Sequence, residues 1–329
     1  MNFVEAVGLT KTYTPKGAEP VHALDGLDLS VPRGTITAIL GPNGAGKTTA
    51  VKVLTTLIIP DSGTATIGGI DVVKRPDDIR PIIGVSGQYA AVDENLTGFE
   101  NLDMVGRLYH LGAKASRARA KELIELFDLT EAMNRPVKGF SGGMRRRIDL
   151  AGALVTQPEV LFLDEPTTGL DPRSRLGMWD IIRSLVSQGT TVLLTTQYLE
   201  EADQLADDIS VIDGGRVIAR GTADELKASV GGQRVELNLV TPDDTAATVE
   251  VLRRYGNAEP AVSNDARTVT VSVARGPEAL QLVLRDLEQR NVALYDAGMR
   301  RPTLDDVFLR LTGRTTEETD SEESKEKAR

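Results

Sequence analysis

One glycine-rich segment, residues 41–48, constrains this chain more than any other feature. Its sequence, GPNGAGKT, matches the pattern G-x-x-x-x-G-K-[ST]. Glycines let backbone N–H groups close around phosphate oxygens, Lys47 adds a positive charge, and the Thr48 hydroxyl can ligate Mg²⁺. A chance match is disfavoured because an apolar run at residues 35–40 precedes the segment and a helix-compatible run follows it. The predicted nucleotide contacts are Gly41, Pro42, Asn43, Gly44, Ala45, Gly46, Lys47, Thr48 and Thr49.

Two adjacent acidic residues end a second apolar run, VLFLDE at residues 160–165. Asp164, at the end of a buried strand, is placed to hold Mg²⁺ directly or through water. Glu165 is expected to accept a proton from an attacking water. Neighbouring strand residues point to opposite sides, so the two carboxylates are expected to have separate tasks. A strand that simply ends in exposed charge is the alternative, which the phosphate loop upstream disfavours.

The composition limits the partners that the chain can take. With a net charge of −10 and 4% aromatic residues, the chain lacks the basic and stacking surfaces that nucleic acids require, so we predict no nucleic acid partner. The basic run at residues 145–147 is interpreted as a solvated helix face. The absence of cysteine excludes disulfides and zinc fingers. We expect neither a signal peptide nor a transmembrane helix, since the longest apolar runs are strand-sized. A membrane role then requires a partner.

The 329 residues suggest two domains. In the first, residues 1–230, short apolar runs alternate with helical patterns, which predicts an α/β fold with a mostly parallel sheet. Residues 97 to about 156 keep helical spacing and are expected to be a helical insert. After a glycine pair the pattern is close to βαββαβ, which predicts a small ferredoxin-like α+β domain at residues 233–312 with a last helix at 304–311. The polar residues 313–329 are expected to be a disordered tail.

A third segment, FSGGM at residues 140–144, gives the chain a second candidate anion site. Ser141 is a good helix N-cap, and Gly142 and Gly143 leave backbone donors uncovered at a helix start. A chain with one triphosphate has little use for two such sites, unless the second serves the nucleotide of another copy. An ordinary capped helix start is the alternative.

With these segments in this order, residues 1–220 resemble the ATP-binding-cassette (ABC) ATPases. The FSGGM segment looks like their signature, although Phe140 stands where Leu is usual and Met144 where Gln is usual. The resemblance implies a P-loop ABC nucleotide-binding domain with a RecA-like core and a helical subdomain. It also implies ATP and Mg²⁺ as cofactors. The signature serine and glycines would close on the γ-phosphate across a homodimer, so that each site is composite.

The resemblance assigns roles to four further positions. Tyr13 matches the aromatic residue that stacks on adenine, and Gln88 the glutamine that reaches the metal and the water; an edge aromatic and a solvated loop glutamine are the alternatives. Asp171 matches a loop that helps link the two sites. At the switch position, where most cassettes have histidine, this chain has Gln197, whose amide can bond a phosphate or water but cannot become an imidazolium. We predict that Gln197 senses the γ-phosphate and that Glu165 is the general base.

Residues 140–150, 195–203 and 302–313 together resemble the daunorubicin-resistance ATP-binding protein group of drug exporters. The resemblance implies an ATP-hydrolysing subunit, peripheral on the cytoplasmic side of the cell membrane, that pairs with a separate permease and powers export of a hydrophobic drug or natural product. A soluble ABC ATPase of repair or translation is the alternative. The short interval between the motifs and the single cassette disfavour it. A nucleotide-dependent switch with little turnover is disfavoured by the intact Lys47, Asp164 and Glu165.

Overall fold

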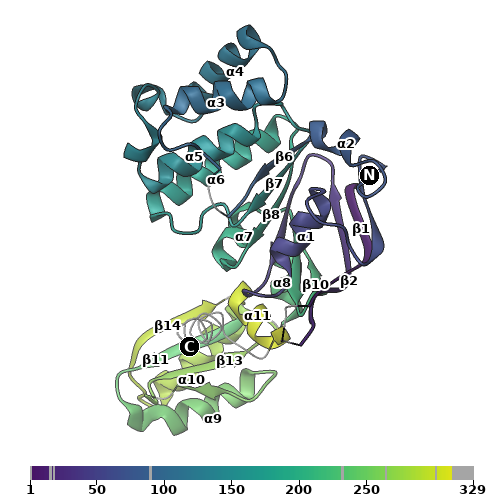
Figure 1. Cartoon of the computed structure of the whole chain (residues 1–329). Coiled ribbons are helices and arrows are strands. Elements are labelled where there is room, and N and C mark those ends of the chain that lie inside the picture. Colours follow the sequence, from purple (N-terminus) through teal and green to yellow (C-terminus); the bar gives the residue numbers. More distant parts are fainter. Residues whose placement is uncertain are drawn as a thin grey trace. The chain divides into compact units, whose positions relative to one another are not determined.

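The computed structural model describes residues 2–14, 17, 19–88, 91–230, 233–263, 265–300 and 302–312. The chain divides into two compact units, one ending at Ala223 and the other beginning at Asp224 (Figure 1). The expected tail at residues 313–329 lies outside the described residues. Among the helices that are described, none is both long and apolar enough to cross a bilayer.

A six-stranded sheet forms the centre of the first unit. Its strand order is β10-β9-β3-β8-β7-β6. The pairs between β9, β3, β8, β7 and β6 are parallel, and β10 pairs with β9 antiparallel. Strands β3, β7 and β8 are buried at every position, which accounts for their continuous apolar or β-branched runs and confirms the predicted sheet. The bounds are β3 (Ile36–Leu40), β6 (Ile83–Ser86), β7 (Val160–Asp164), β8 (Thr191–Thr196), β9 (Asp208–Asp213) and β10 (Arg216–Gly221).

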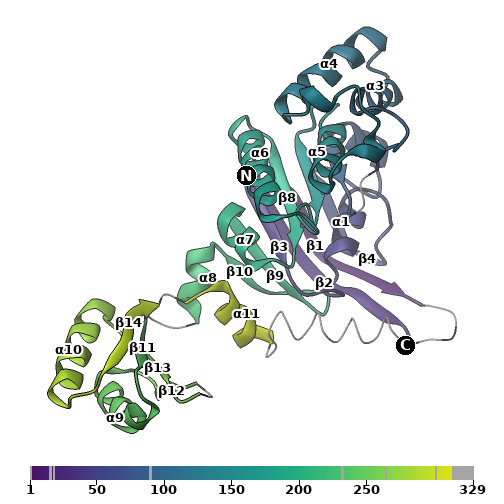
Figure 2. The same ribbon diagram turned by 90° about the vertical axis from the view of Figure 1, so that its left-hand side faces the viewer.

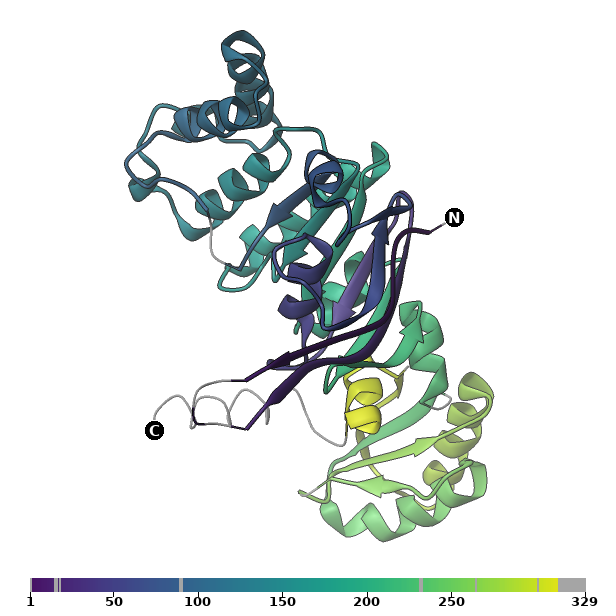
Figure 3. The ribbon, with the colours of Figure 1, turned by 45° about the vertical axis from the view of Figure 1, so that its right-hand side comes forward.

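A second, antiparallel sheet in the same unit was not predicted from the sequence. Its order is β2-β1-β4-β5, from β1 (Asn2–Tyr13), β2 (Val21–Pro32), β4 (Ser62–Ile67) and β5 (Ile70–Asp71). The long β1–β2 ribbon is drawn in purple in Figure 3. The pairing of β1 with β2 shifts register at several points, and such bulges break the strict alternation by which a strand is recognised in a sequence.

Helix α1 (Lys47–Leu54) packs between the two sheets. Its Ala50, Val51, Val53 and Leu54 share one buried core with side chains of β1, β2, β4 and β7. Helices α6 (Pro172–Ser187) and α7 (Leu199–Leu205) cover the opposite face of the parallel sheet (Figure 2). The phosphate-loop segment therefore joins a central strand to a helix that is held on both sides, which gives it a rigid base.

Three helices form a helical arm at residues 97–156, beyond strand β6 in Figure 1: α3 (Gly98–Leu108), α4 (Ala113–Leu126) and α5 (Gly142–Ala153). Thr97 and Glu100 make a reciprocal capping box at the start of α3. Phe140 is buried with Val137, and Met144 packs against that cluster. The two unusual residues of the FSGGM segment thus have a packing role within the arm.

The second unit has its own antiparallel sheet, of order β12-β13-β11-β14, and its own core. Helices α9 and α10 pack with strands β11 and β13 in that core. The element order and sheet order confirm the predicted ferredoxin-like arrangement. The bounds are α8 (Ala223–Ser229), β11 (Arg234–Leu239), α9 (Thr245–Tyr255), β12 (Ala261–Val262), β13 (Thr268–Ser272), α10 (Gly276–Gln289), β14 (Leu294–Arg300) and α11 (Leu304–Thr312). Shorter helical turns lie at Pro76–Ile79 (α2), Arg80–Ile82, Thr130–Ala132, Val137–Gly139 and Pro242–Asp244.

Candidate functional site

The phosphate loop lies between β3 and α1, and two of its glycines cannot be replaced without a clash. At Gly46 the backbone has φ 105°, and an added Cβ would lie 2.2 Å from the carbonyl oxygen of Ala23. At Gly41 an added Cβ would lie 2.4 Å from the carbonyl oxygen of Ile212. The loop can therefore keep this close-packed path only with glycine at both positions.

Lys47 is buried inside the loop, with 4% of its side chain exposed. Its Nζ donates to the carbonyl oxygens of Gly41, at 2.8 Å, and Pro42, at 3.0 Å. The same Nζ lies 3.5 Å from Glu165 Oε1. A buried ammonium held by backbone carbonyls and one carboxylate is a preformed point charge for an anionic group entering the loop.

Thr48 and Asp164 form the candidate Mg²⁺ site. The Thr48 hydroxyl donates to Asp164 Oδ1 at 3.2 Å, and the Thr195 hydroxyl donates to the same oxygen at 2.6 Å. Mg²⁺ prefers oxygen ligands and is usually held by one or two protein groups together with waters and phosphates. A hydroxyl beside a carboxylate at the mouth of the phosphate loop fits that donor set.

Glu165 follows β7 in a left-handed backbone conformation, with φ 51°. Its N–H donates to the carbonyl oxygen and to the hydroxyl oxygen of Thr195, each at 3.1 Å. Its side chain is 8% exposed and accepts a hydrogen bond from the Thr168 hydroxyl at 3.3 Å. The turn in the backbone brings this carboxylate to Lys47, whereas Asp164 faces Thr48.

A cavity of about 430 Å³, within the size range of small-ligand sites, is lined by Lys47, Thr48 and Glu165, whereas Asp164 is not among its described lining residues. Tyr13 lies at its rim with 39% exposure, and Gln88 reaches it from the segment after β6. Val21 and Ala23 of β2 also line the cavity and were missed by the sequence analysis, because apolar strand residues carry no motif. The predicted residues in its wall are Tyr13, Asn43, Gly44, Gly46, Lys47, Thr48, Thr49, Gln88 and Glu165.

The signature residues of the FSGGM segment do not line this cavity. Ser141 caps α5 by accepting from the N–H of Met144 at 3.2 Å, and neither it nor Gly142 nor Gly143 is among the described residues lining the cavity. An added Cβ at Gly143 would lie 2.7 Å from Ser174 Oγ, so the first turns of α5 and α6 are in contact.

Asp171 caps helix α6. Its carboxylate accepts hydrogen bonds from the hydroxyl of Ser174 at 2.6 Å and from the backbone N–H of Ser174 at 3.0 Å. These bonds hold the pKa of Asp171 below its usual value. Like the signature residues, Asp171 is absent from the described wall of the cavity.

Gln197 follows β8, two residues after Thr195. Its Oε1 is buried and has no hydrogen-bond partner among the residues that the structure describes. A buried amide oxygen without a donor is costly, and a bound water or ligand group would supply the missing bond. The prediction that Gln197 contacts the γ-phosphate remains a prediction.

The interpretation of residues 145–147 as a solvated face is wrong for Arg146. Its side chain is 8% exposed and lies 3.7 Å from the carboxylate of Asp149, which is 6% exposed. Burial lowers the pKa of Arg146 and raises that of Asp149. For Asp149 this rise is opposed by hydrogen bonds from the Ser86 hydroxyl and the Ala91 N–H. The sequence could not indicate this, because the guanidinium of Arg146 donates four hydrogen bonds to backbone carbonyl oxygens, which every residue has.

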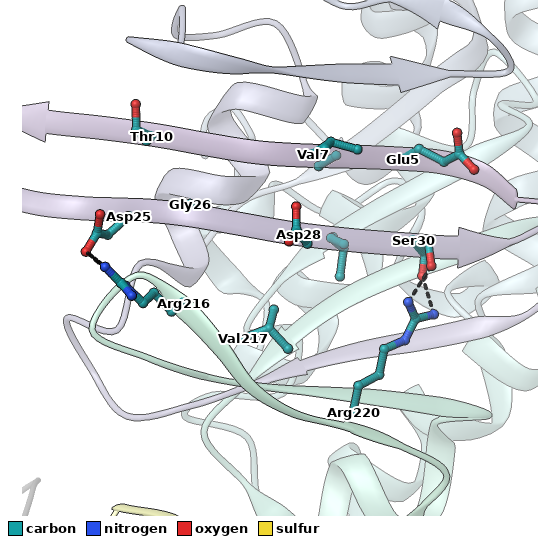
Figure 4. Close-up of a pocket in the computed structure, with 12 residues that line it drawn as sticks. Glu5, Val7, Thr10, Asp25, Gly26, Asp28, Ser30, Arg216, Val217 and Arg220 are labelled. Carbon is teal, nitrogen blue, oxygen red and sulfur yellow. Dashed lines mark hydrogen bonds and ion pairs between the residues drawn. The ribbon is translucent and has the colours of Figure 1, made fainter.

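A larger hollow of about 950 Å³ lies against the outer side of β1, β2 and β10 (Figure 4). Both of its arginines are engaged within the unit. Arg216 pairs with Asp25 at 2.7 Å, and Arg220 pairs with Asp208 at 2.7 Å and donates to the carbonyl oxygen of Ser30 at 2.9 Å. Each arginine among the described residues of this hollow is therefore already paired with a carboxylate.

Fold and site together define an ATP-binding cassette. A family model described as ABC transporter matches residues 24–168. Among solved structures, a dimeric post-hydrolysis state of an ATP-binding cassette bound to ADP and Pi aligns with a TM-score of 0.61 at 28% identity, covering 67% of this chain and 98% of that one.

Comparison with individual curated proteins narrows the family within the ATP-binding cassettes. It is 53% identical to the daunorubicin resistance ATP-binding protein DrrA2 of Streptomyces coeruleorubidus, over 98% of both chains. It is 47% identical to the daunorubicin/doxorubicin resistance ATP-binding protein DrrA of Streptomyces peucetius, over 98% of this chain and 96% of that one. A model for the C-terminal domain of DrrA1-3-like ATP-binding proteins matches residues 221–312. The chain belongs to this family of ABC transporter ATP-binding proteins and is an ATPase.

Proposed function

We propose that the chain is the ATP-hydrolysing subunit of an exporter and works as two copies on the cytoplasmic side of the cell membrane, bound to a separate integral-membrane permease. The proposed cargo is a hydrophobic drug-like compound or natural product. The relatives named for daunorubicin and doxorubicin resistance support the cargo class.

The two-copy arrangement is supported by the separation between the phosphate-loop cavity and the start of α5. Lys47 and Glu165 line the cavity, whereas the exposed start of α5, with Ser141 and Gly142, does not. An uncovered helix start attracts an anion, and the phosphate in the loop of a second copy supplies one. The dimeric form of the solved cassette supports the same arrangement.

Each predicted site residue has a task in the proposed reaction. The phosphate loop and Lys47 bind the triphosphate, Tyr13 stacks on adenine, and Asp171 links the two sites. Thr48, Asp164 and Gln88 hold Mg²⁺, which neutralises charge on the phosphates when it is bound. Glu165 accepts the proton of the attacking water.

Gln197 completes the γ-phosphate end of the site. Its buried Oε1 lacks a donor among the described residues, and a water hydrogen-bonded to the phosphate would provide one. Because an amide does not take up a proton near neutral pH, Gln197 orients or senses and leaves proton transfer to Glu165.

The experiment that tests the proposal is recovery of the permease. Tagged chain is crosslinked in its native cells and purified from detergent-extracted membranes. We expect a protein with several transmembrane helices to co-purify. Cells that produce both proteins should then accumulate less daunorubicin than cells that produce the permease with the Lys47→Ala chain.

Recovery with ribosomes or DNA alone would instead support a soluble ABC ATPase of translation or repair. The resistance function in the names of the two relatives does not favour that alternative. Equal daunorubicin accumulation with the wild-type and Lys47→Ala chains would remove the proposed cargo class while leaving the ATPase activity in place.

A further inference from the structure

We propose that Arg146 is a positioning residue which, with Asp149, fixes the signature helix α5 to the two segments that carry Gln88 and Glu165. The inference rests on the proposed function in one respect, namely that Glu165 and Gln88 act on the water and the metal. The contacts of the two residues lie within the first unit.

Four hydrogen bonds from the Arg146 guanidinium all end on backbone carbonyl oxygens. Three acceptors lie at the end of β7 and just beyond it: Nη2 donates to Asp164, at 3.1 Å, and to Glu165, at 3.0 Å, and Nε donates to Pro166, at 2.8 Å. The fourth acceptor is Gly87, which receives a bond from Nη1 at 2.5 Å. One rigid planar group thus joins α5 to both catalytic segments.

Asp149, one turn further along α5, holds the Gln88 segment from either side. One carboxylate oxygen accepts from the Ser86 hydroxyl at 2.6 Å, and the other accepts from the Ala91 N–H at 2.7 Å. Together with the bond from Arg146 to Gly87, three anchor points bracket Gln88. The buried carboxylate is in turn balanced by the guanidinium 3.7 Å away.

The contact to Glu165 acts on a strained residue. A non-glycine residue at φ 51° persists only where its surroundings hold it there. Thr195 holds the Glu165 N–H from β8, and Arg146 holds the Glu165 carbonyl from α5. Loss of the second anchor lets the peptide relax and turns the carboxylate away from Lys47.

Within one copy, helix α5 and Arg146 connect the signature to the copy's own Glu165 and Gln88. Helix α5 starts with the signature that serves the nucleotide of the other copy, and its next turn holds the Glu165 and Gln88 of its own site. A shift of α5 when the signature engages a phosphate therefore reaches the copy's own general base through Arg146.

The test is a kinetic comparison of full-length Arg146→Lys with wild type, using Mg-ATP. Lysine keeps the charge and cannot span four acceptors. We expect kcat to fall about 10- to 100-fold, since misplacing a reacting group by about 1 Å costs that much. The ATP KM should stay within about threefold, because the phosphate loop is untouched. A role in stability alone would lower the melting temperature without this division between kcat and KM.

The matched control is Arg145→Lys on the same helix. Arg145 donates to the carbonyl oxygen of Lys138 and pairs with Glu94 at 3.3 Å, and neither partner belongs to the segments that carry Gln88 and Glu165. Its kcat should stay within about twofold of wild type. The Trp179 fluorescence of each variant reports whether the first unit is folded.

A second variant, Asp149→Asn, decides the question if Arg146→Lys does not fold. The amide of asparagine keeps the size of the side chain and one acceptor but removes the charge beside Arg146. The kcat should again fall, and the ATP KM should stay within about threefold of wild type. The proposal is overturned if folded variants keep the wild-type kcat, if KM and kcat deteriorate together, or if Arg145→Lys loses as much activity. A wild-type turnover no higher than that of Lys47→Ala would instead refute the proposed function.

Discussion

At the scale of single residues, Glu165 has the least common geometry in the cavity. Left-handed backbone at a non-glycine residue costs on the order of 1–3 kcal/mol. The strain separates two adjacent carboxylates: Asp164 stays in line with β7 and meets Thr48, and Glu165 turns to within 3.5 Å of Lys47. The turn therefore gives each carboxylate its own partner.

Replacing Glu165 with Gln should lower ATP turnover by about 10²- to 10⁴-fold, because the amide cannot accept the proton of the attacking water. ATP affinity should change little, since the phosphate loop is intact. Replacing Gln197 with Ala should cost less turnover than Glu165→Gln. Steady-state hydrolysis and equilibrium binding of Mg-ATP measure both. If Glu165→Gln stayed near wild type while Gln197→Ala abolished hydrolysis, the two roles would be reversed.

Glu201 gives a prediction about pH and stability. It is fully buried, with Oε1 accepting from the Thr167 hydroxyl at 2.7 Å and Trp179 Nε1 at 3.1 Å, and burial raises its pKa above 4.5. The folded state thus holds this proton more tightly than the unfolded state. The contribution of Glu201 to the free energy of unfolding is therefore greatest below pH 4.5 and falls as pH rises through the folded pKa.

Glu201→Gln, which keeps the acceptor and removes the charge, should melt at higher temperature than wild type at neutral pH. Each kcal/mol gained corresponds to about 2–4 °C in a unit of this size. The difference should shrink towards pH 4.5. Thermal scans between pH 4.5 and 8 measure it, and exposed Glu200→Gln is the control. A gain that did not depend on pH would show that the charge of Glu201 is not its cause.

At the scale of elements, the contact between the starts of α5 and α6 determines what the signature tolerates. Gly143 faces Ser174 with no room for a Cβ, whereas an added Cβ at Gly142 meets nothing within 4 Å in this chain. Of the two neighbouring glycines, only Gly143 therefore has a packing reason within this chain to be glycine. A Cβ at position 143 would force the Ser174 side chain of α6 to move, whereas a Cβ at position 142 would meet open space.

We expect Gly143→Ala to lower the melting temperature of the first unit and Gly142→Ala to leave it unchanged or raise it, because alanine is favoured over glycine in a helix by up to about 1 kcal/mol. Differential scanning calorimetry of the nucleotide-free chain compares them. Adding Ser174→Ala should restore part of the loss at Gly143, since it removes the nearer of the two contacting atoms. Equal effects at both glycines would mean that the α5–α6 contact does not limit the signature.

The elements that could be predicted from sequence are those whose side chains carry the chemistry. The sequence predicts the phosphate loop from its glycines and Lys47. It predicts the end of β7 from two adjacent acidic residues, and the buried strands from their continuous apolar runs. The β1–β2 ribbon does not, because its bulges break the alternation. The role of Arg146 could not be predicted either, since its acceptors are peptide carbonyls, which every residue has. The proposed composite site could not be examined in one copy, because its signature half would come from a second copy.

At the scale of the whole molecule, the two units have separate hydrophobic cores. The single tryptophan of the chain, Trp179, belongs to the first unit. Trp179 fluorescence therefore follows the unfolding of one unit, and far-ultraviolet circular dichroism follows both.

Mg-ATP should raise the melting temperature of the transition that Trp179 fluorescence follows. A second transition, seen only by circular dichroism, should keep its melting temperature. Ligand at 100 times its Kd adds about 2.7 kcal/mol to the unit that binds it. Glu165→Gln, which slows hydrolysis during the scan, is the suitable background, and Lys47→Ala is the control without a shift. One shared transition that moves as a whole with nucleotide would show that the units unfold cooperatively.

Deleting residues 315–329 should leave ATP turnover at the wild-type value, because the only apolar residue of this charged segment is Ala328, which is too small to anchor it. The measurement is kcat of the shortened chain beside that of the full chain. A large loss would assign the segment a part in the catalytic cycle.

The hydrogen bonds from Arg146 to peptide carbonyls have a consequence for how the contact tolerates substitution. The carbonyls of residues 87, 164, 165 and 166 are present whatever side chains those positions carry. Substitution of those side chains leaves the four acceptors in place, so the contact with Arg146 does not depend on which residues stand there. A comparison of residue types alone would therefore not reveal the four bonds that join the signature helix to the segments carrying Gln88 and Glu165.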